Sequence, residues 1–138
     1  MPRLKGSPGR LPASLVAAVD ESQIIGVRAG ARSRHRFTGV WAVVVGGRVF
    51  ARSWTRKPDG WFSTFLTDPS GAIQVGARTA RVHAVRRTGV RLWAAVERAY
   101  AAKYHTPASL KYVRGFRTRR RRETTVEFVP RASGTRRA

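Results

Sequence analysis

Apolar and polar positions alternate along much of the chain, which is the two-residue period of strands with one buried face. Together with short apolar runs rich in β-branched residues, this pattern predicts six strands, at residues 23–29, 37–45, 48–54, 72–77, 79–87 and 123–129. The segment FTGVWAVVV, residues 37–45, is apolar at nearly every position, as expected of a strand covered on both faces. It stops at Gly46-Gly47, which predicts a two-residue hairpin into the next strand.

Three other segments have features of helices. VRLWAAVERAYAAKYH, residues 90–105, repeats large apolar side chains every three or four positions and predicts a long amphipathic helix. A short helix is expected at WFSTFLTD, residues 61–68, where Asp59 or Gly60 begins it. SLVAAV, residues 14–19, predicts a third helix near the N-terminus.

These elements predict a mainly β (α+β) fold, a small barrel of about six strands with a short inserted helix and one longer helix at its rim. A sandwich of the same strands is the rival architecture. We expect a flexible N-terminus with a short helix over residues 1–19, a single domain over 20–130 and a disordered basic tail over 131–138. No apolar run is long enough to cross a bilayer, and the absence of cysteine fits a reducing cytoplasmic location.

Charge is the strongest feature of the composition: 28 Lys and Arg against seven Asp and Glu give a net charge of +21. Only four of the cations are Lys, so one interpretation is the amino-acid bias of a GC-rich genome, with solvated charged faces. The other is a polyanionic partner, attracted by the long-range field. The run RTRRRR predicts either a solvated loop or a contact with nucleic-acid backbone through Arg119, Arg120, Arg121 and Arg122.

Protein-based catalysis finds little support in the sequence. His35, His83 and His105 are scattered and have no neighbours at metal-ligand spacing, so no metal site is predicted. The acids are also dispersed, and no GxSxG, P-loop or GxGxxG motif is present. If the protein is an enzyme, a bound cofactor is expected to supply the reactive atoms.

The stretch SWTRKPDGWFSTFL, residues 53–66, is the better candidate for a site. Arg56 and Lys57 precede a predicted helix start, where the helix dipole disfavours cations. A phosphate would remove this conflict, because the helix start, Thr55, Lys57 and Arg52 can all donate hydrogen bonds to it. The alternative is that these cations are solvated in a turn and the aromatic rings are core.

Further residues are predicted around the same pocket. Trp54 and Trp61 would flank a flat ring system. Arg36 and Thr38, at the end of the preceding loop, are weaker candidates for the same pocket.

The series VWAVVVGGRVFARSW, GWF, AIQVGARTARVHAV, AYAAKY and TTVEFVP resembles the bacterial family called domain of unknown function 2255. That family in turn resembles the flavin-binding split β-barrels, which include pyridoxamine phosphate oxidases and deazaflavin-dependent nitroreductases. The oxidase motif for the flavin phosphate is a strand followed by a hydroxyl, a basic residue and a lysine. Here it falls on Thr55, Arg56 and Lys57.

The stretch GWFSTFLTDP is similar to the nitroreductase segment that contains a Trp before a short helix, although Phe65 stands where those proteins have Asn. The resemblance therefore implies a split β-barrel that binds FMN or a deazaflavin and acts as an oxidoreductase on a small organic substrate. It also implies a homodimer with cofactor between the subunits.

The predicted cofactor-binding set contains cations, hydroxyls and indoles from two segments of the chain. Ser53 is expected to support the end of its strand. The full set is Arg36, Thr38, Arg52, Ser53, Trp54, Thr55, Arg56, Lys57 and Trp61. The alternative function is a non-enzymatic module that binds nucleic acid or another polyanion.

Overall fold

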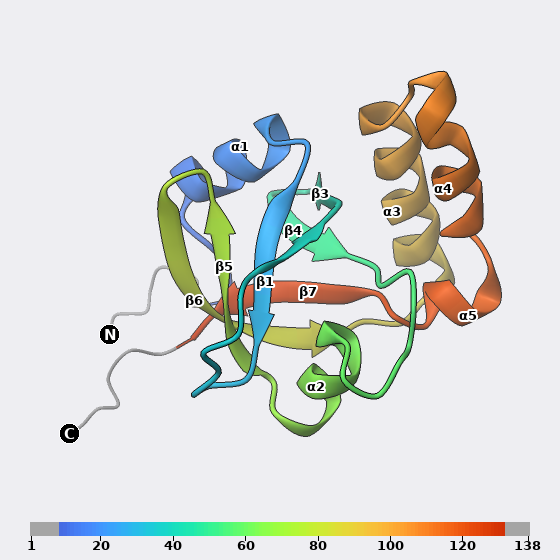
Figure 1. Ribbon diagram of the computed structural model, residues 1–138. Coiled ribbons are helices and arrows are strands. Elements are labelled where there is room, and N and C mark those ends of the chain that lie inside the picture. The colour runs from blue at the N-terminus through green and yellow to red at the C-terminus, as the bar shows by residue number, and fades with distance from the viewer. Residues whose placement is uncertain (1–8, 132–138) are drawn as a thin grey trace.

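A single antiparallel sheet of seven strands dominates the computed structural model, which describes residues 9–131 (Figure 1). The strands are β1 (Ile25–Ala29), β2 (Thr38–Val40), β3 (Ala42–Val45), β4 (Arg48–Ala51), β5 (Ser70–Val75), β6 (Arg78–Arg86) and β7 (Val126–Pro130). Their order across the sheet is β2-β1-β5-β6-β7-β4-β3. The last strand in the sequence therefore lies inside the sheet, between β6 and β4.

The sheet curls into a nearly closed barrel because its two edge strands are neighbours in the sequence. Only Trp41 separates β2 from β3, although they occupy opposite ends of the strand order. Residues two apart in an extended chain are at most about 7 Å apart, so the two edges must come together at this point. This connection shows that the sheet forms a barrel and not a sandwich.

The prediction of one strand over residues 37–45 is therefore wrong. The segment forms β2 and β3, which pair with β1 and β4 respectively at opposite edges. The chain turns at Trp41, whose ring stacks on Tyr104 with centroids 4.1 Å apart. A run of apolar residues indicates burial but carries no information on this change of partner strand, and the division accounts for the seventh strand.

Both predicted hairpins are confirmed. β3 pairs with β4 through Gly46 and Gly47, whose φ angles of +59° and +76° are those that a tight hairpin turn requires at both central positions. β5 pairs with β6 over six residue pairs. In β4, Val49 and Ala51 face the barrel interior while Phe50 faces the opposite side, as the alternation predicts.

Helices cover both ends and one flank of the barrel, and α1 and α2 lie at opposite ends of it in Figure 1. The helices are α1 (Ala13–Glu21), α2 (Trp61–Thr67), α3 (Val90–Lys103), α4 (Leu110–Gly115), α5 (Arg119–Arg122) and the 3-10 turn η1 (Pro107–Ser109). Leu15 and Val19 of α1 belong to the same core as Phe62 and Phe65 of α2. Helix α1 is thus part of the domain.

A second, smaller core lies outside the barrel, between β3 and β4 and the pair α3 and α4. It contains Phe50, Val96, Tyr100, Val113 and Phe116. The sequence predicted α3 but not α4, η1 or α5, each of which is six residues or shorter. The predicted disordered tail lies outside the described residues except for Arg131.

Candidate functional site

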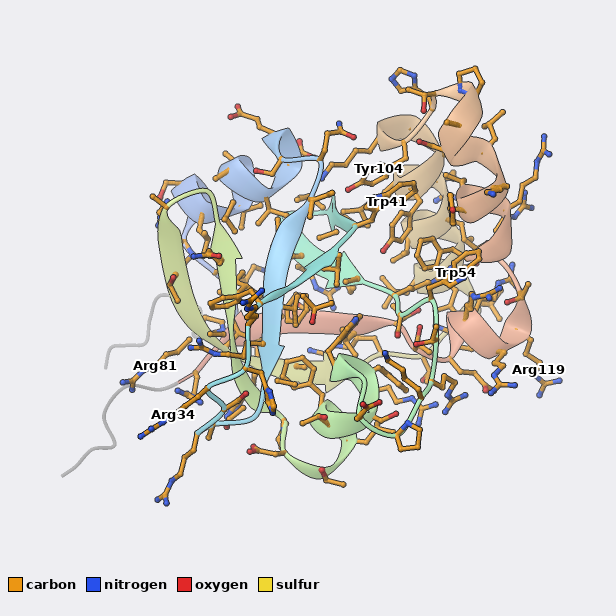
Figure 2. All side chains as sticks on the ribbon, in the orientation of Figure 1. Arg34, Trp41, Trp54, Arg81, Tyr104 and Arg119 are labelled. Carbon is orange, nitrogen blue, oxygen red and sulfur yellow. The ribbon has the colours of Figure 1, made fainter. Side chains whose placement is uncertain are left out.

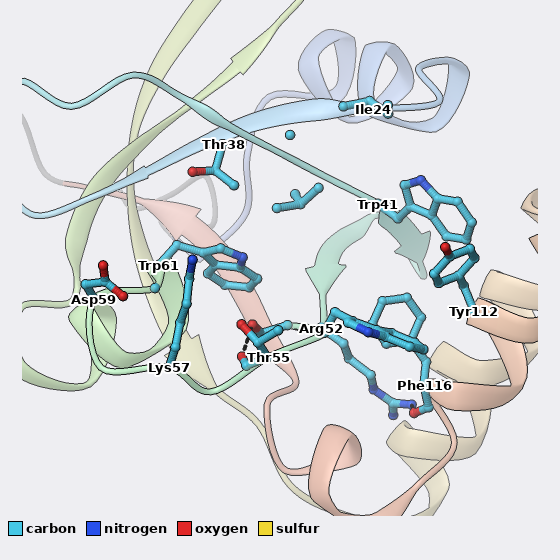
Figure 3. Close-up of a pocket in the computed structure, with 15 residues that line it drawn as sticks. Ile24, Thr38, Trp41, Arg52, Thr55, Lys57, Asp59, Trp61, Tyr112 and Phe116 are labelled. Atoms are coloured by element: carbon cyan, nitrogen blue, oxygen red, sulfur yellow. Dashed lines mark hydrogen bonds between the residues drawn. The ribbon is translucent and has the colours of Figure 1, made fainter.

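A cavity of about 520 Å³ opens at the seam of the barrel, where β2 and Trp41 face the segment that follows β4 (Figure 3). The start of α2 and one side of α4 complete its walls. The lining residues are Ile24, Thr38, Gly39, Val40, Trp41, Arg52, Ser53, Trp54, Thr55, Lys57, Asp59, Gly60, Trp61, Tyr112 and Phe116. Seven of the nine residues predicted for a cofactor site are among them.

Lys57 and Thr55 supply polar groups to this cavity. The Lys57 side chain extends from the loop alongside Trp61 in Figure 3. Among residues 9–131, neither the Lys57 ammonium nor the Thr55 hydroxyl has a hydrogen-bond or ion-pair partner. Asp59, which also lines the cavity, forms no salt bridge within this part of the chain. These groups are therefore available to a ligand.

Aromatic rings form much of the remaining wall. Trp61 packs edge-on against Phe62 and Phe65, with ring centroids 6.3 and 6.0 Å apart, and so borders both the barrel core and the cavity. On the opposite side, Trp41 is held by its stack on Tyr104. Flat apolar surfaces on two sides suit a planar ring system.

Trp54 is held by contacts with Arg121 and with two rings of the α4 segment. The guanidinium of Arg121 lies 3.6 Å from the centre of its ring, and the Nε of Arg121 donates to its backbone carbonyl over 2.9 Å. Its ring also meets Tyr112 and Phe116 edge-on. It lies so close to Gly115 that a Cβ there would come within 2.3 Å of the indole. Residue 115 must therefore be glycine for Trp54 to occupy this place.

Tyr100 fixes the two sides of the seam relative to each other. Its hydroxyl donates to the carbonyl of Trp41 over 2.6 Å and accepts from the backbone N–H of Arg52 over 3.0 Å. Burial raises the pKa of this phenol, so it stays neutral and can act as donor and acceptor at once. The walls of the cavity are thus held by a buried group of α3.

Arg52 is not available to a phosphate, contrary to its predicted role. Its side chain is 0% exposed and donates to Glu97 over 3.0 Å and to Thr125 over 2.8 Å. It also donates to the backbone carbonyls of Phe116 and Trp93. Burial lowers the pKa of Arg52, while its hydrogen bond to Glu97 opposes that shift. Arg52 joins β4 to α3, α4 and β7 instead of binding a ligand.

Arg56 also turns away from the cavity. Its guanidinium lies 3.5 Å from Glu123 and 5.4 Å from the centre of the Phe62 ring. Ser53 follows the end of β4, where its hydroxyl donates to the carbonyl of Thr55 and its N–H donates to Thr124 over 2.9 Å. Adjacent residues of the predicted motif thus have different surroundings.

Thr38 lines the cavity, but Arg36 lines a smaller neighbouring chamber of about 80 Å³. Thr38 borders both spaces, together with Asp59 and Trp61. The two residues predicted as weaker candidates are therefore near the site, and Arg36 is one chamber away from Lys57.

The four arginines predicted to contact nucleic acid have different environments in the structure. Arg121 stacks on Trp54, and Arg122 forms a bidentate pair with Glu97, with distances of 2.6 and 2.9 Å. Arg119 remains 91% exposed on the side chain and projects from the surface, on the opposite side of the molecule from Arg34 and Arg81 (Figure 2). Arg120 is exposed as well. Two of the four arginines are thus structural.

Sequence reasoning missed several residues of the wall. Tyr112 and Phe116 belong to α4, which the sequence did not predict, and Trp41 was assigned to the interior of one strand. The recurrence of Leu110, Val113 and Phe116 at three-residue spacing was the available signal for a helix here.

Residues 9–131 contain no cluster of three or more metal-ligating side chains. None of the helices in that range has both the length and the apolar character needed to cross a bilayer.

A family model for uncharacterised proteins conserved in bacteria, DUF2255, matches residues 14–128. No curated protein matches the chain in sequence. Among solved structures, the crystal structure of the conserved hypothetical protein Rv2991 from Mycobacterium tuberculosis is similar in fold. The TM-score is 0.57 with 13% identity, over 94% of this chain and 85% of that one, which shows the fold alone. Because the family match spans most of the sequence, the chain belongs to the DUF2255 family of uncharacterised bacterial proteins.

Proposed function

We propose that the cavity at the barrel seam binds a flavin or deazaflavin that carries a phosphate. The observation that carries this proposal is the meeting of Lys57, a cation without a partner among residues 9–131, with tryptophan side chains around one open space. The volume of about 520 Å³ is typical of sites for small molecules, which range over about 300–1,000 Å³.

The aromatic walls support the ring part of such a ligand. Trp61, the first residue of α2, borders the cavity on one side, and Trp41 and Trp54 border it where they meet Tyr112 of α4. An isoalloxazine or deazaflavin ring between them would gain the contact that flat aromatic surfaces give each other, about 0.5–1.5 kcal/mol per pair beyond area burial.

The phosphate part would be held by fewer groups than the sequence suggested. Within the described part of the chain, Lys57 and the Thr55 hydroxyl remain free to donate, whereas Arg52 and Arg56 have carboxylate partners. One lysine and one hydroxyl can hold a phosphate, and hydrogen bonds that involve an ionised group are the strong ones. The residues present therefore fit a phosphate-bearing flavin, with Lys57 as the main anchor.

A bound flavin or deazaflavin would supply hydride or electron transfer. The proposed activity is therefore that of an oxidoreductase acting on a small organic substrate. The residues of this chain would bind the cofactor and exclude water from its ring. The exposed apolar side chains of Ile24 and Tyr112 border the same cavity and are compatible with a second copy covering it. Sedimentation with and without FMN would test that dimer.

The test is a fluorescence titration of the full chain with FMN, riboflavin and a deazaflavin. We expect saturable binding of FMN or of the deazaflavin. FMN should bind at least about tenfold more tightly than riboflavin, which has the same ring and no phosphate. Binding of neither cofactor to a folded sample would overturn the proposal, and equal affinity for FMN and riboflavin would remove the role of Lys57.

A second candidate function is association with nucleic acid through the exposed arginines Arg119 and Arg120. The observation that favours it is that these two side chains remain exposed on a chain of net charge +21. Salt-dependent binding of duplex DNA should have a log-log slope that falls by about 2 when both are changed to Gln, since each phosphate contact contributes about 0.9. An unchanged slope would exclude this surface.

A further inference from the structure

One edge of the sheet borders the main cavity. β2 stands at one end of the strand order, and within residues 9–131 it pairs with β1 alone. Its three residues, Thr38, Gly39 and Val40, all line the cavity. An edge strand presents backbone N–H and C=O groups that no neighbouring strand uses. The cavity wall therefore contains part of a free strand edge.

The pairing pattern shows which backbone groups β2 offers. In an antiparallel pair, successive residues direct their N–H and C=O alternately toward the partner strand and away from it. β2 pairs over three consecutive residues, so either Gly39 or both of its neighbours direct these groups away from β1. Within residues 9–131, no hydrogen bond outside the ladder involves the backbone of Thr38, Gly39 or Val40. Such a residue presents a donor and an acceptor side by side.

The edge at the other end of the sheet is closed by side chains of α3. The carbonyl of Ala42, the first residue of β3, accepts from the Lys103 ammonium over 2.7 Å and from the Tyr104 hydroxyl over 3.4 Å. The carbonyl of the preceding Trp41 accepts from the Tyr100 hydroxyl. The two edges meet at Trp41, but α3 supplies partners only to the β3 side within the described part of the chain.

The opposite wall of the cavity is the segment of residues 53–57. Thr38 lies on one side of the pocket in Figure 3, and Thr55 and Lys57 lie on the other. Each carbonyl of residues 53–57 already accepts a hydrogen bond from the chain. The donors are the side chains of Thr124, Arg121, Ser53 and Ser63 and the N–H of Gly60. Of these two walls, β2 is thus the one with open backbone acceptors.

We propose that the free edge of β2 hydrogen-bonds the edge of a planar lactam or imide ring that lies between the tryptophans of the cavity. A ring of this class carries an N–H beside a C=O in the ring plane. That arrangement complements the N–H and C=O of one outward-facing residue of β2. The inference rests on the proposed function and deepens it, since flavin and deazaflavin rings both carry an imide edge.

A peptide strand is the other molecule that a free strand edge can accept. β2 has only three residues, and the chain turns at Trp41 toward β3, so an added strand would gain few ladder hydrogen bonds. The cavity beside the edge has the volume of a small-molecule site and is walled by indole rings, which suit a planar ligand. These features favour the ring.

The first experiment compares riboflavin with riboflavin methylated at its imide nitrogen, by fluorescence titration of the full chain. The two ligands have the same aromatic ring and neither carries a phosphate, so Lys57 does not contribute to the difference. The methyl group removes the donor and leaves a backbone acceptor of β2 unpaired. We expect at least about fivefold weaker binding of the methylated compound. Equal affinities would overturn the inference.

Two variants separate recognition by the backbone from recognition by side chains. Thr38→Val and Asp59→Ala remove side-chain oxygens that line the cavity and are able to accept the imide N–H. Whatever these changes do to overall affinity, the preference for riboflavin over its methylated form should stay within about twofold of the wild-type value. Loss of the preference in either variant would assign the recognition to that side chain and overturn the role of the strand edge.

Amide NMR spectra of the isotopically labelled chain locate the contact. At saturation with riboflavin, at least one amide of β2 should shift more than any amide of β3, and the methylated compound should not produce this shift. The amides of β3 are the matched reference, because that strand borders the same seam at the edge that α3 closes. Shifted tryptophan indole signals with unchanged β2 amides would contradict the inference.

Lumazine, a two-ring compound with the same imide edge, separates the inference from the proposed function. If the chain binds neither flavin nor deazaflavin but prefers lumazine to lumazine methylated at the imide nitrogen, the proposed function fails and the recognition by β2 stands. If riboflavin binds and its methylated form binds equally well, the proposed function stands and the inference fails. Binding of neither ring system would overturn both and leave a peptide strand as the occupant of the edge.

Discussion

Cationic side chains lie on both sides of the segment 52–57, but only those on one side have carboxylate partners among residues 9–131. Toward α3 and α5, Arg52 and Arg122 share the carboxylate of Glu97. Toward the barrel seam, Lys57 has no carboxylate partner among residues 9–131. The number of cations is thus a poor guide to a binding site. What distinguishes the seam is that no carboxylate among residues 9–131 neutralises its cation Lys57.

The distribution of the acids explains the difference. The chain has seven acids, and Glu97, Glu123 and Glu127 gather on the side of α3, α5 and β7, where each contacts at least two arginines. A buried cation without a partner is costly, so these carboxylates are needed where arginines are enclosed. Lys57 at the seam borders open space, so it needs no carboxylate partner and remains available to a ligand.

The largest expected effect comes from removing a carboxylate that is paired with a buried arginine. Glu97→Gln leaves the fully enclosed guanidinium of Arg52 without its carboxylate. Loss of one partner of a buried pair costs about 3 kcal/mol or more, so the free energy of unfolding in urea should fall by about that amount. Glu123→Gln is the matched control, because Glu123 is 38% exposed and its pairs measure 3.5 and 3.9 Å. It should cost under about 1 kcal/mol, and equal losses in both variants would contradict the account.

A second expected effect concerns the shape of the seam. Gly115→Ala places a Cβ against the Trp54 ring, so the indole must leave its place between Arg121 and Tyr112. Overpacking of this kind costs about 1–3 kcal/mol, and the displaced wall should weaken flavin binding as well. Urea unfolding and flavin fluorescence measure the two losses. Wild-type stability and binding in this variant would show that Trp54 is not fixed by its contacts.

Lowering the pH should reduce stability through the carboxylates that are paired with arginines. Burial disfavours ionisation of Glu97 and Glu127, but hydrogen bonds from arginines outweigh it and lower the pKa of both carboxyls below the usual value. Groups whose pKa is lowered on folding stabilise the protein above the unfolded pKa and lose that contribution as pH falls through the folded pKa. The melting temperature should therefore fall below about pH 4.5, and less steeply in Glu97→Gln than in the wild type.

Most of the barrel was predictable from the sequence because its strands carry local signals. Alternation located the hairpin of β5 and β6, and Gly46-Gly47 located the turn between β3 and β4. The change of edge at Trp41 was not predictable, because it depends on a stack with Tyr104, 63 residues later in the chain.

The candidate site was predictable only as a region. Lys57, Thr55 and Trp61 line one cavity, and they are also close together in the sequence. Arg52 and Arg56 were indistinguishable from Lys57 at that level, since their partners Glu97 and Glu123 lie 45 and 67 residues away. Which cation is neutralised is decided by tertiary structure alone.

The smallest expected effect in free energy tests the central claim most directly: FMN titration of Lys57→Ala and Arg56→Ala side by side. The two substitutions remove neighbouring positive charges, one that faces the cavity and one that faces Glu123. We predict that Lys57→Ala weakens FMN binding about tenfold, equivalent to about 1.4 kcal/mol, while Arg56→Ala changes it by less than about twofold. Equal weakening by both variants, or none by either, would contradict the claim that the free cation of the seam recognises the ligand.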